Sequence, residues 1–418
     1  MPATAPVPMA MQSTKILDRK QDFPLLHESQ LGRSLHYLDS AATTQKPMEV
    51  IDAVSDCYRN VYGPINRGLY PLAEAATAAY AEARAGVARF IGAPASEQLI
   101  FTRGTTDAIN MVAWGWARPR LQPGDRVWIT RMEHHANFLP WQRICRERSA
   151  ELRIIDLNED GSLNLNAATE LFDTRTRLIA LCQISNVLGT EHPVAALCTR
   201  AAALGIPVLV DAAQSVAHKS VDVATIDCDF LAFSAHKMYG PSGIGALYGK
   251  AQRLEEMEPL LVGGGMVDHV APDTATWTVC PDRFEAGSPN LSGAIGFAAA
   301  AGYLSRIGMD AIAAHETALT QQAVSQLARL PRVSLLPPGA ATRASIISID
   351  IEGIHPHDVA QLAGERGVAL RAGHHCCQPL MQHLGLPATT RASFGIYNQP
   401  EDVDALISAV EAVCRMFA

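Results

Sequence analysis

Short apolar runs alternate with longer amphipathic segments between residues 98 and 249. Each run has five to nine residues, is rich in Val, Ile, Leu and Phe, and carries apolar side chains on both faces, as buried strands do. Segments of helical length, such as residues 107–116 and 194–204, separate several of these runs. The alternation predicts an α/β domain with a mostly parallel central sheet. The predicted strands are residues 98–102, 126–130, 152–157, 177–185, 207–211, 229–234 and 244–249.

After residue 302 the pattern changes to longer helices with few strands, which predicts a second, smaller α+β domain. We therefore expect a large domain at residues 21–300 and a small C-terminal domain at residues 301–418. Residues 1–20, which are rich in Pro and Ala, are expected to form a flexible extension. The helices predicted in the small domain are residues 308–330, 356–366 and 401–417, and its strands are residues 345–351 and 368–371.

The composition narrows the classes of function. The chain is 48% hydrophobic and 18% charged, which is typical of globular proteins and excludes a disordered or coiled-coil protein. Its net charge of −8 offers nothing to attract nucleic acid or an anionic membrane, and no apolar run approaches the ~20 residues of a membrane span. Nine cysteines lack any C-x-x-C pair, and no signal peptide is recognisable, so we expect free thiols and a cytoplasmic location.

Candidate chemistry follows the strand ends, because ligands of open α/β sheets bind beyond the carboxyl ends of the strands. The first predicted strand leads into Arg103-Gly104-Thr105-Thr106 and then into a helical segment. A glycine that permits close backbone approach, two hydroxyls and a helix N-terminus together favour a phosphate. The alternative is a threonine that merely caps the helix.

Two charged residues follow other predicted strands. Asp211 comes after four apolar residues, where a carboxylate needs a cationic partner such as a protonated ring nitrogen, although it could also cap the next helix. Lys237 follows the strand at residues 229–234 and precedes a Gly-rich turn. Desolvation there would lower the pKa of the lysine and favour the free amine that a Schiff base requires. The alternative is a lysine paired with a nearby carboxylate.

A histidine and a cysteine complete the set of candidates. His134 follows the strand at residues 126–130 and could stack on an aromatic cofactor, move protons or serve only a structural role. Cys376 lies beside His and Arg in the sequence RAGHHCC, the setting of a nucleophilic thiol. Zinc is a weaker alternative, since the four consecutive residues 374–377 cannot all converge on one tetrahedral ion. Together these pieces are what a protein needs to hold pyridoxal 5'-phosphate (PLP) beside a nucleophile.

The chain resembles the SufS-type (group II) cysteine desulfurases, which are members of the class V aminotransferase family. The resemblance runs from about Phe23 to the C-terminus and implies the PLP-dependent fold type I architecture, with a large domain and a smaller C-terminal domain. Its segments are RGTTDAIN, RMEHHANFLPWQ, SNVLGTEHP, VDAAQSV, FSAHKMYGPSGIGALY, RFEAGSPN, RAGHHCCQPLM and RASFGIYN.

The resemblance implies a role for each matching residue toward PLP. Lys237 would form the Schiff base with the cofactor, and Asp211 would keep its pyridine nitrogen protonated. Gln214 would bind the phenolic oxygen, and His134 would stack on the ring. The residues that would hold the phosphate are Thr105, Thr106, Ser234 and His236, together with Ser288 of the partner subunit in a homodimer.

The same resemblance implies conversion of L-cysteine to L-alanine. Asn186 and Arg391 would bind the substrate carboxylate, the latter as a bidentate fork, and Lys237 would move the Cα proton. The thiolate of Cys376 would take the sulfur as a persulfide. A SufE- or SufU-like acceptor protein would then receive it for iron–sulfur cluster assembly. The short loop around Cys376 fits an acceptor that docks.

Three positions depart from the family pattern: Asn66 stands where a His is frequent, Ser288 where a Thr is frequent, and Cys377 where Ala is common. Cys377 could relay the persulfide, form a vicinal disulfide or simply pack. Selenocysteine lyase activity on the same site is an alternative function. A class V aminotransferase would have no reason to keep Cys376, and a non-catalytic scaffold could have lost Lys237.

Overall fold

The computed structural model describes residues 17–27, 34–166, 170, 172–337 and 343–417. Most of the extension predicted at residues 1–20 therefore lies outside the described residues. Within the described part of the chain, no helix has both the length and the apolar character needed to cross a membrane.

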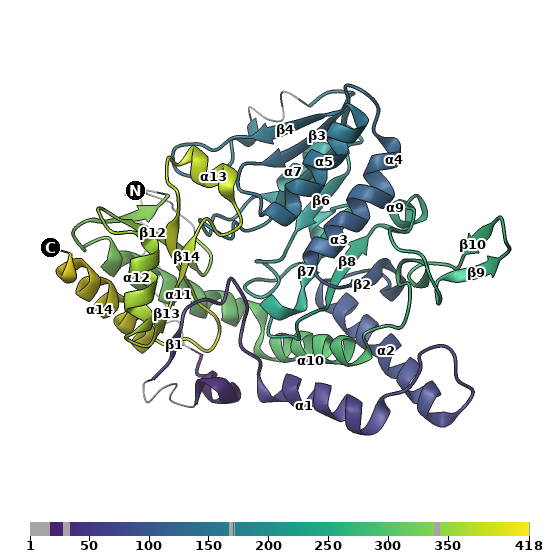
Figure 1. The fold of residues 1–418 in the computed structure, drawn as a ribbon, viewed down its shortest axis with the longest axis horizontal. Helices are drawn as coiled ribbons and strands as arrows, with labels where there is room; N and C mark the ends of the chain where they lie inside the picture. Colours follow the sequence, from purple (N-terminus) through teal and green to yellow (C-terminus); the bar gives the residue numbers. More distant parts are fainter. Residues whose placement is uncertain (1–16, 28–33, 167–169, 171, 338–342, 418) are drawn as a thin grey trace, which may run out of the picture.

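The large central sheet has seven strands in the order β2-β8-β7-β6-β5-β3-β4 (Figure 1). All neighbours in it are parallel except β8, which is antiparallel to both β2 and β7, so the predicted mostly parallel sheet is confirmed. Its strands are β2 (Leu99–Thr102), β3 (Arg126–Thr130), β4 (Glu151–Ile155), β5 (Thr176–Cys182), β6 (Val208–Asp211), β7 (Phe230–Ser234) and β8 (Gly245–Gly249).

Both faces of this sheet are covered, which explains why its strands read as continuous apolar runs. Successive residues alternate between two hydrophobic clusters: Leu209 packs in one, and Val208 and Val210 pack in the other. The face of Leu209 is covered by α3 (Thr105–Met111), η5 (Val112–Ala117), α5 (Leu139–Arg148) and α9 (Ala251–Glu255). The opposite face is covered by α2 (Pro71–Phe90), α7 (Val194–Ala202), α8 (Val223–Ile226) and α10 (Leu291–Ile307).

A second sheet, antiparallel and in the order β11-β12-β15-β14, forms the C-terminal part. Its strands are β11 (Val333–Leu336), β12 (Ile346–Ile351), β14 (Arg371–Gly373) and β15 (Thr389–Ser393). The helices packed against it are α11 (Met309–Leu327), α12 (Pro356–Gly364) and α14 (Pro400–Met416), whereas α13 (Gln378–His383) packs Leu380 and Met381 into a hydrophobic cluster of the large sheet. The predicted domain boundary near residue 300 falls within α10 and stays a prediction.

The N-terminal segment crosses to the C-terminal part, which the sequence did not indicate. Strand β1 (His36–Tyr37) pairs in parallel with β13 (Val368–Ala369), and Leu38 is buried in the C-terminal hydrophobic cluster. The strand predicted at residues 368–371 is therefore divided between β13 and β14.

Some of the remaining elements lie toward the outside. Figure 1 shows the hairpin of β9 (Val267–Val270) and β10 (Ala275–Trp277) projecting from the body, and α1 (Met48–Asp56) lying beside α10.

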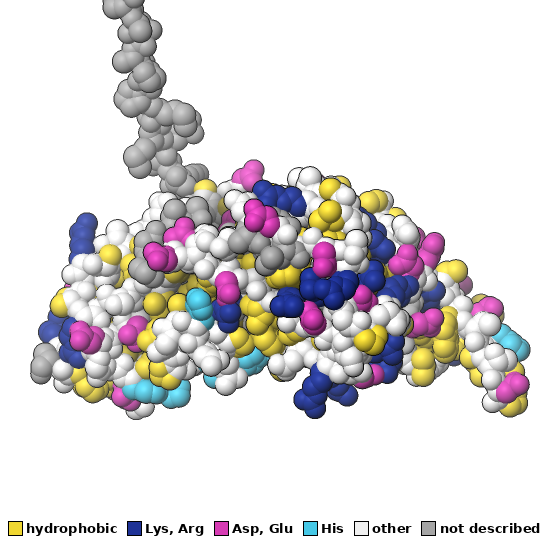
Figure 2. All heavy atoms as spheres, turned by 90° about the horizontal axis from the view of Figure 1, so that it is seen from above, with side chains coloured by type: hydrophobic (Ala, Val, Ile, Leu, Met, Phe, Trp, Pro, Cys, Tyr) yellow, Lys and Arg dark blue, Asp and Glu magenta, His cyan; other side chains and the backbone are white. Residues whose placement is uncertain are grey.

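On the face over β3 and β4, Lys and Arg side chains are interspersed with Asp and Glu (Figure 2), in agreement with pairs such as Arg126–Asp173 at 2.7 Å. The short helices are η1 (Lys20–Asp22), η2 (Pro24–Leu26), η3 (Cys57–Val61), η4 (Ser96–Gln98), α4 (Arg118–Arg120), η6 (His135–Asn137), η7 (Ala235–Lys237) and η8 (Asp282–Phe284).

Candidate active site

A cavity of about 270 Å³ lies where the carboxyl ends of β5, β6 and β7 meet residues of the C-terminal sheet. Eleven of the twelve residues singled out from the sequence line it. Ser288 instead lines a separate cavity of about 1150 Å³ together with Asn66, so its contact with the phosphate of a partner subunit stays a prediction. The eleven are Thr105, Thr106, His134, Asn186, Asp211, Gln214, Ser234, His236, Lys237, Cys376 and Arg391.

A buried carboxylate and a buried amine lie in the same part of the cavity. Asp211 ends β6, and burial raises the pKa of its carboxyl. Lys237 ends η7, directly after β7, and burial lowers the pKa of its amine to about 8, although the charge of Asp211 opposes this. Among the described residues, Lys237 forms no ion pair within 4.0 Å, so the pairing alternative from the sequence finds no support. Lys237 therefore loses its proton near pH 8, well below the pH at which an exposed lysine does.

Two hydroxyl groups and the N-terminus of helix α3 lie at another part of the cavity. The Thr105 backbone N–H donates to Ser234 Oγ at 2.8 Å, and the two hydroxyl oxygens lie 2.6 Å apart. Helix α3 begins at Thr105 with Gly104 as its N-cap and without a side-chain cap, so the threonine-cap alternative is wrong. Burial lowers the pKa of His236 to about 4, with further lowering by Lys237, and its ring is neutral. This arrangement suits a phosphate.

His134 is held in one tautomer. Its Nδ1 accepts from the Ala136 backbone N–H at 3.1 Å, which places the ring proton on Nε2. Burial, followed by the charge of Lys237, lowers the pKa of this ring to about 3, so it is neutral. A neutral imidazole beside Asp211 and Lys237 offers a flat face to an aromatic ring.

Glu133, which the sequence analysis missed, anchors the segment that carries His134. It is fully buried, and its Oε1 accepts from Thr130 Oγ1 at 2.6 Å and from the Cys182 N–H at 3.0 Å. Its Oε2 accepts from Asn137 Nδ2 at 2.6 Å. Burial outweighs these donors and raises the pKa of the carboxyl to about 7.

The loop that carries Cys376 is strained and tied to the large sheet. His375 and Cys376 have φ angles of 50° and 55°, in the left-handed region that side chains disfavour. The carbonyl of Cys376 accepts from the His135 N–H at 2.7 Å, and the carbonyl of His375 accepts from Asn186 Nδ2 at 2.7 Å. These bonds hold the partly exposed Cys376 thiol at the cavity.

Cys377 points away from the cavity. It is fully buried, and its thiol donates to the Glu133 carbonyl at 3.2 Å. Burial raises the pKa of this thiol to about 12, and both neighbouring cysteines are free thiols. These observations favour the packing interpretation. The zinc alternative fails for a related reason: Cys377 turns to Glu133, and His375 turns to Thr389 Oγ1 at 2.9 Å.

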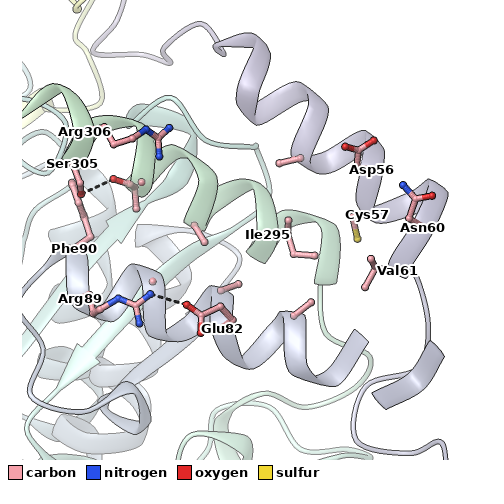
Figure 3. A pocket seen from close by; sticks show the side chains of 17 residues that line it. Asp56, Cys57, Asn60, Val61, Glu82, Arg89, Phe90, Ile295, Ser305 and Arg306 are labelled. Atoms are coloured by element: carbon pink, nitrogen blue, oxygen red, sulfur yellow. Dashed lines mark hydrogen bonds and ion pairs between the residues drawn. The ribbon is translucent and has the colours of Figure 1, made fainter. Parts of the chain in front are cut away.

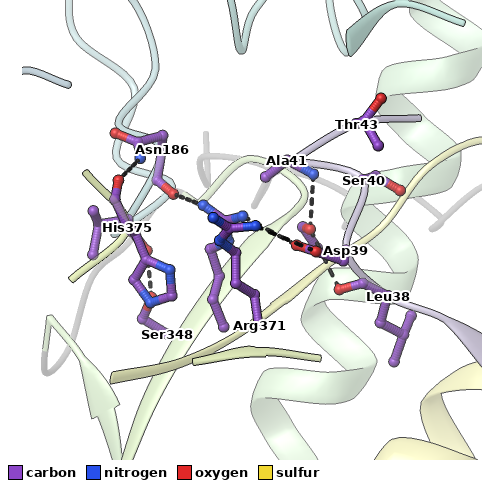
Figure 4. Close-up of polar contacts among 12 residues, drawn as sticks. Leu38, Asp39, Ser40, Ala41, Thr43, Asn186, Ser348, Arg371 and His375 are labelled. Atoms are coloured by element: carbon purple, nitrogen blue, oxygen red, sulfur yellow. Dashed lines mark hydrogen bonds and ion pairs between the residues drawn. The ribbon is translucent and has the colours of Figure 1, made fainter. Parts of the chain in front are cut away.

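Arginines face the cavity from the C-terminal sheet (Figure 4). Arg391 is buried, with Nη1 donating to the Asn186 carbonyl at 2.8 Å and Nη2 to Asp39 Oδ1 at 3.1 Å. Arg371 lies 3.9 Å from the other oxygen of Asp39. Neither Asp39 nor Arg371 was among the residues selected from the sequence. An arginine fork at this place suits a carboxylate.

The residues present fit PLP. Lys237 supplies an amine for its aldehyde, Asp211 a buried carboxylate for its pyridine nitrogen, and His134 a neutral ring for stacking. Gln214 lines the cavity and donates from Nε2 to the Ala41 carbonyl at 2.8 Å. Its predicted bond to the phenolic oxygen stays a prediction.

Comparisons with known proteins agree with this geometry. Residues 36–406 match the family model Aminotransferase class-V. A cysteine desulfurase of Dickeya dadantii (strain 3937) is 45% identical over 402 residues, which are 96% of this chain and 97% of that protein. The structure of the cysteine desulfurase CsdA from Escherichia coli is similar with a TM-score of 0.88 at 40% identity, covering 95% of this chain and 98% of that one. The apo cysteine desulfurase from Thermococcus onnurineus NA1 gives a TM-score of 0.90 at 37% identity, covering 95% and 97%. The chain therefore belongs to the PLP-dependent class V aminotransferase family, and within it to the cysteine desulfurases.

Proposed function

We propose that this protein converts L-cysteine to L-alanine and retains the sulfur as a persulfide on Cys376. The observation that carries the proposal is the placement of the Cys376 loop and of Lys237 in one cavity, with Arg391 beside them. A thiol held at the cavity by main-chain bonds is what separates a desulfurase from an aminotransferase.

When bound, PLP supplies an electron sink for the bond changes at the substrate Cα. Arg391 binds the substrate carboxylate through its guanidinium, and the backbone carbonyl of Asn186 holds Nη1. Direct binding of the carboxylate by Asn186 stays a prediction. The amine of Lys237, whose pKa is lowered to about 8, accepts the Cα proton and can return it. Neutral His134 keeps its proton on Nε2, because its Nδ1 accepts from the Ala136 backbone N–H.

The sulfur step belongs to Cys376. Its thiolate forms an S–S bond to the substrate sulfur while the Cβ–S bond breaks. The electron pair of that bond stays with the carbon, which takes up a proton, and alanine leaves. The enzyme keeps the sulfur as a Cys376 persulfide, and an acceptor thiol then removes it. We propose a SufE- or SufU-like protein as the acceptor, since Cys376 is partly exposed at a short loop that a partner can approach.

We further propose a homodimer in the cytoplasm. An apolar cavity of about 830 Å³ lies between α1, α2 and α10 (Figure 3), with Cys57, Val61 and Ile295 around it. Tyr58 and Tyr62, at 60% and 56% exposure, stand next to it, and such a surface suits a second copy of the chain. The free thiols of all nine cysteines support a reducing compartment. Molar mass by light scattering tests the dimer.

The test of function is alanine release from L-cysteine under reducing conditions by the wild type and by Cys376→Ala. We expect release by the wild type and none by the variant, with Cys377→Ala as a matched control that stays active. Equal release by wild type and Cys376→Ala would contradict the assigned nucleophile. The same two proteins are also assayed with L-selenocysteine. If Cys376→Ala loses activity on L-cysteine but keeps it on L-selenocysteine, the enzyme also acts as a selenocysteine lyase.

A further inference from the structure

Arg371 and Arg391 share a single carboxylate, that of Asp39. Figure 4 shows Asp39 and Arg371 side by side. The two arginines are direct register partners across β14 and β15. Asp39 Oδ1 lies 3.1 Å from Arg391 Nη2, and Asp39 Oδ2 lies 3.9 Å from Arg371 Nη1. Both arginines line the cavity, whereas Asp39 is outside its lining.

The backbone fixes Asp39 behind the arginines. Asp39 forms a parallel bridge with Ser393, and its carbonyl accepts from the Ala42 N–H at 3.0 Å. The side chain is 20% exposed; burial raises the pKa of its carboxyl, while Arg391 and Arg371 lower it. A substrate carboxylate entering the cavity therefore meets Arg391 with Asp39 still in place.

The charges then balance for one carboxylate. Two guanidinium groups and one carboxylate leave a single positive charge on this side of the cavity, equal and opposite to one α-carboxylate. Donors also remain, since the Nε–H of Arg391 is buried and has no hydrogen-bond partner among the described residues. Arg371, at 47% side-chain exposure, is held toward Asp39 rather than left for a second anion.

We propose that Asp39 determines specificity by balancing one of the two arginines, so that the site accepts amino acids with one carboxylate and disfavours those with two. The inference rests on the proposed substrate site. Without the negative charge of Asp39, Arg371 and Arg391 together would also bind the second carboxylate of a substrate. We therefore assign the discrimination between one and two carboxylates to Asp39 rather than to Arg391.

The experiment compares L-alanine with L-aspartate on the PLP-loaded enzyme, using the change in the visible absorbance of the cofactor to measure each dissociation constant. In Asp39→Asn, which keeps the shape and removes the charge, we expect the ratio of the aspartate constant to the alanine constant to fall about tenfold. Asp39→Glu keeps the charge and should keep the ratio. Asp173→Asn, which breaks an exposed pair with Arg126, is the matched control and should leave it unchanged.

The outcomes separate this inference from the proposed function. If the wild type fails to bind L-alanine, both the substrate site and the role of Asp39 are overturned. If the wild type binds L-alanine but the ratio in Asp39→Asn changes less than about threefold, only the role of Asp39 is overturned. Should Asp39→Asn not hold PLP, Arg371→Gln decides: we expect about tenfold weaker L-alanine binding, and unchanged binding would overturn the charge balance.

Discussion

Replacing Glu133 by Gln tests whether this buried carboxylate holds the segment that carries His134. The carboxylate accepts three hydrogen bonds, from Thr130 Oγ1, Asn137 Nδ2 and the Cys182 N–H. A glutamine of the same shape has one acceptor oxygen, which can serve Thr130 and Cys182. Its amide group would then face the amide of Asn137, donor against donor.

Asn137 cannot relieve this conflict by turning its side chain. Its Oδ1 already accepts from Trp141 Nε1 at 2.8 Å, and rotation of the amide would break that bond within the core. One unsatisfied buried donor costs roughly 1–3 kcal/mol, so we expect Glu133→Gln to lose that much free energy of unfolding. Glu133→Ala leaves three donors unpaired and should lose ~3 kcal/mol or more.

The measurement is the free energy of unfolding from urea titration of the apoprotein, followed by circular dichroism. Glu147→Gln is the matched control, because this exposed carboxylate pairs with Arg118 on the surface and should change stability by less than ~0.5 kcal/mol. We also expect kcat to fall in Glu133→Gln, since the His135 N–H holds the Cys376 carbonyl. Stability of Glu133→Gln within ~0.5 kcal/mol of the wild type would refute the reasoning.

Three further predictions concern single groups of the cavity. The rate at which the apoprotein captures PLP should rise between pH 7 and pH 9 and then level off, because the amine of Lys237 loses its proton near pH 8. Stopped-flow absorbance measures this rate, and a rate that does not change over this range would contradict the lowered pKa. Cys377→Ala should leave the persulfide on Cys376 in mass spectra, and loss of that sulfur would restore the relay interpretation. Arg391→Lys should raise KM for L-cysteine about tenfold or more with a smaller effect on kcat. A lysine has a single nitrogen and lacks the planar fork whose separate nitrogens bind Asn186 and Asp39 here. Equal KM values would argue against carboxylate binding at Arg391.

The large sheet could be predicted from the sequence because most of its strands, such as β2, β6, β7 and β8, are buried on both faces. Residues 207–211 form an apolar run without polar alternation, which is typical of a buried strand. Its last residue, Asp211, lies at the carboxyl end of the strand, where ligands of such sheets bind. The same logic placed Lys237 and Ser234 correctly at the end of β7. The carboxyl ends of parallel strands lie on the same side of a sheet, so polar residues that follow predicted strands are expected to share one site.

The residues that were missed depend on contacts between distant parts of the chain. Strand β1 has only two residues and pairs with Val368 and Ala369, so no local periodicity reveals that the following segment brings Asp39 to the arginines and Ala41 to the cavity. Likewise, Glu133 and Cys377 are sequence neighbours of His134 and Cys376, and the fold buries both and lets the Cys377 thiol donate to the Glu133 backbone carbonyl. Both residues are buried where the loop that carries Cys376 packs against the segment that carries His134, and the sequence pattern does not indicate this contact.

Gly245 shows how a glycine at the start of a predicted strand, next to a Gly-rich turn, can control the site. It is the register partner of both Thr102 in β2 and Ser234 in β7, and a Cβ there would lie 2.6 Å from the Cα of Gly104 and 2.5 Å from the Phe233 carbonyl. Because Gly104 starts the helix that offers Thr105 to the phosphate, Gly245→Ala should push the two halves of the phosphate site apart.

Overpacking of this kind costs roughly 1–3 kcal/mol, which would weaken PLP binding about fivefold to 150-fold if the strain is relieved at the site. Equilibrium binding of PLP to the apoprotein, followed by absorbance, measures the effect. Gly364→Ala is the control, because a Cβ at this helical position in α12 meets no atom within 4 Å. PLP affinity equal to that of the wild type in Gly245→Ala would mean that β8 moves as a unit and that the phosphate site does not depend on the contact between Gly245 and Gly104.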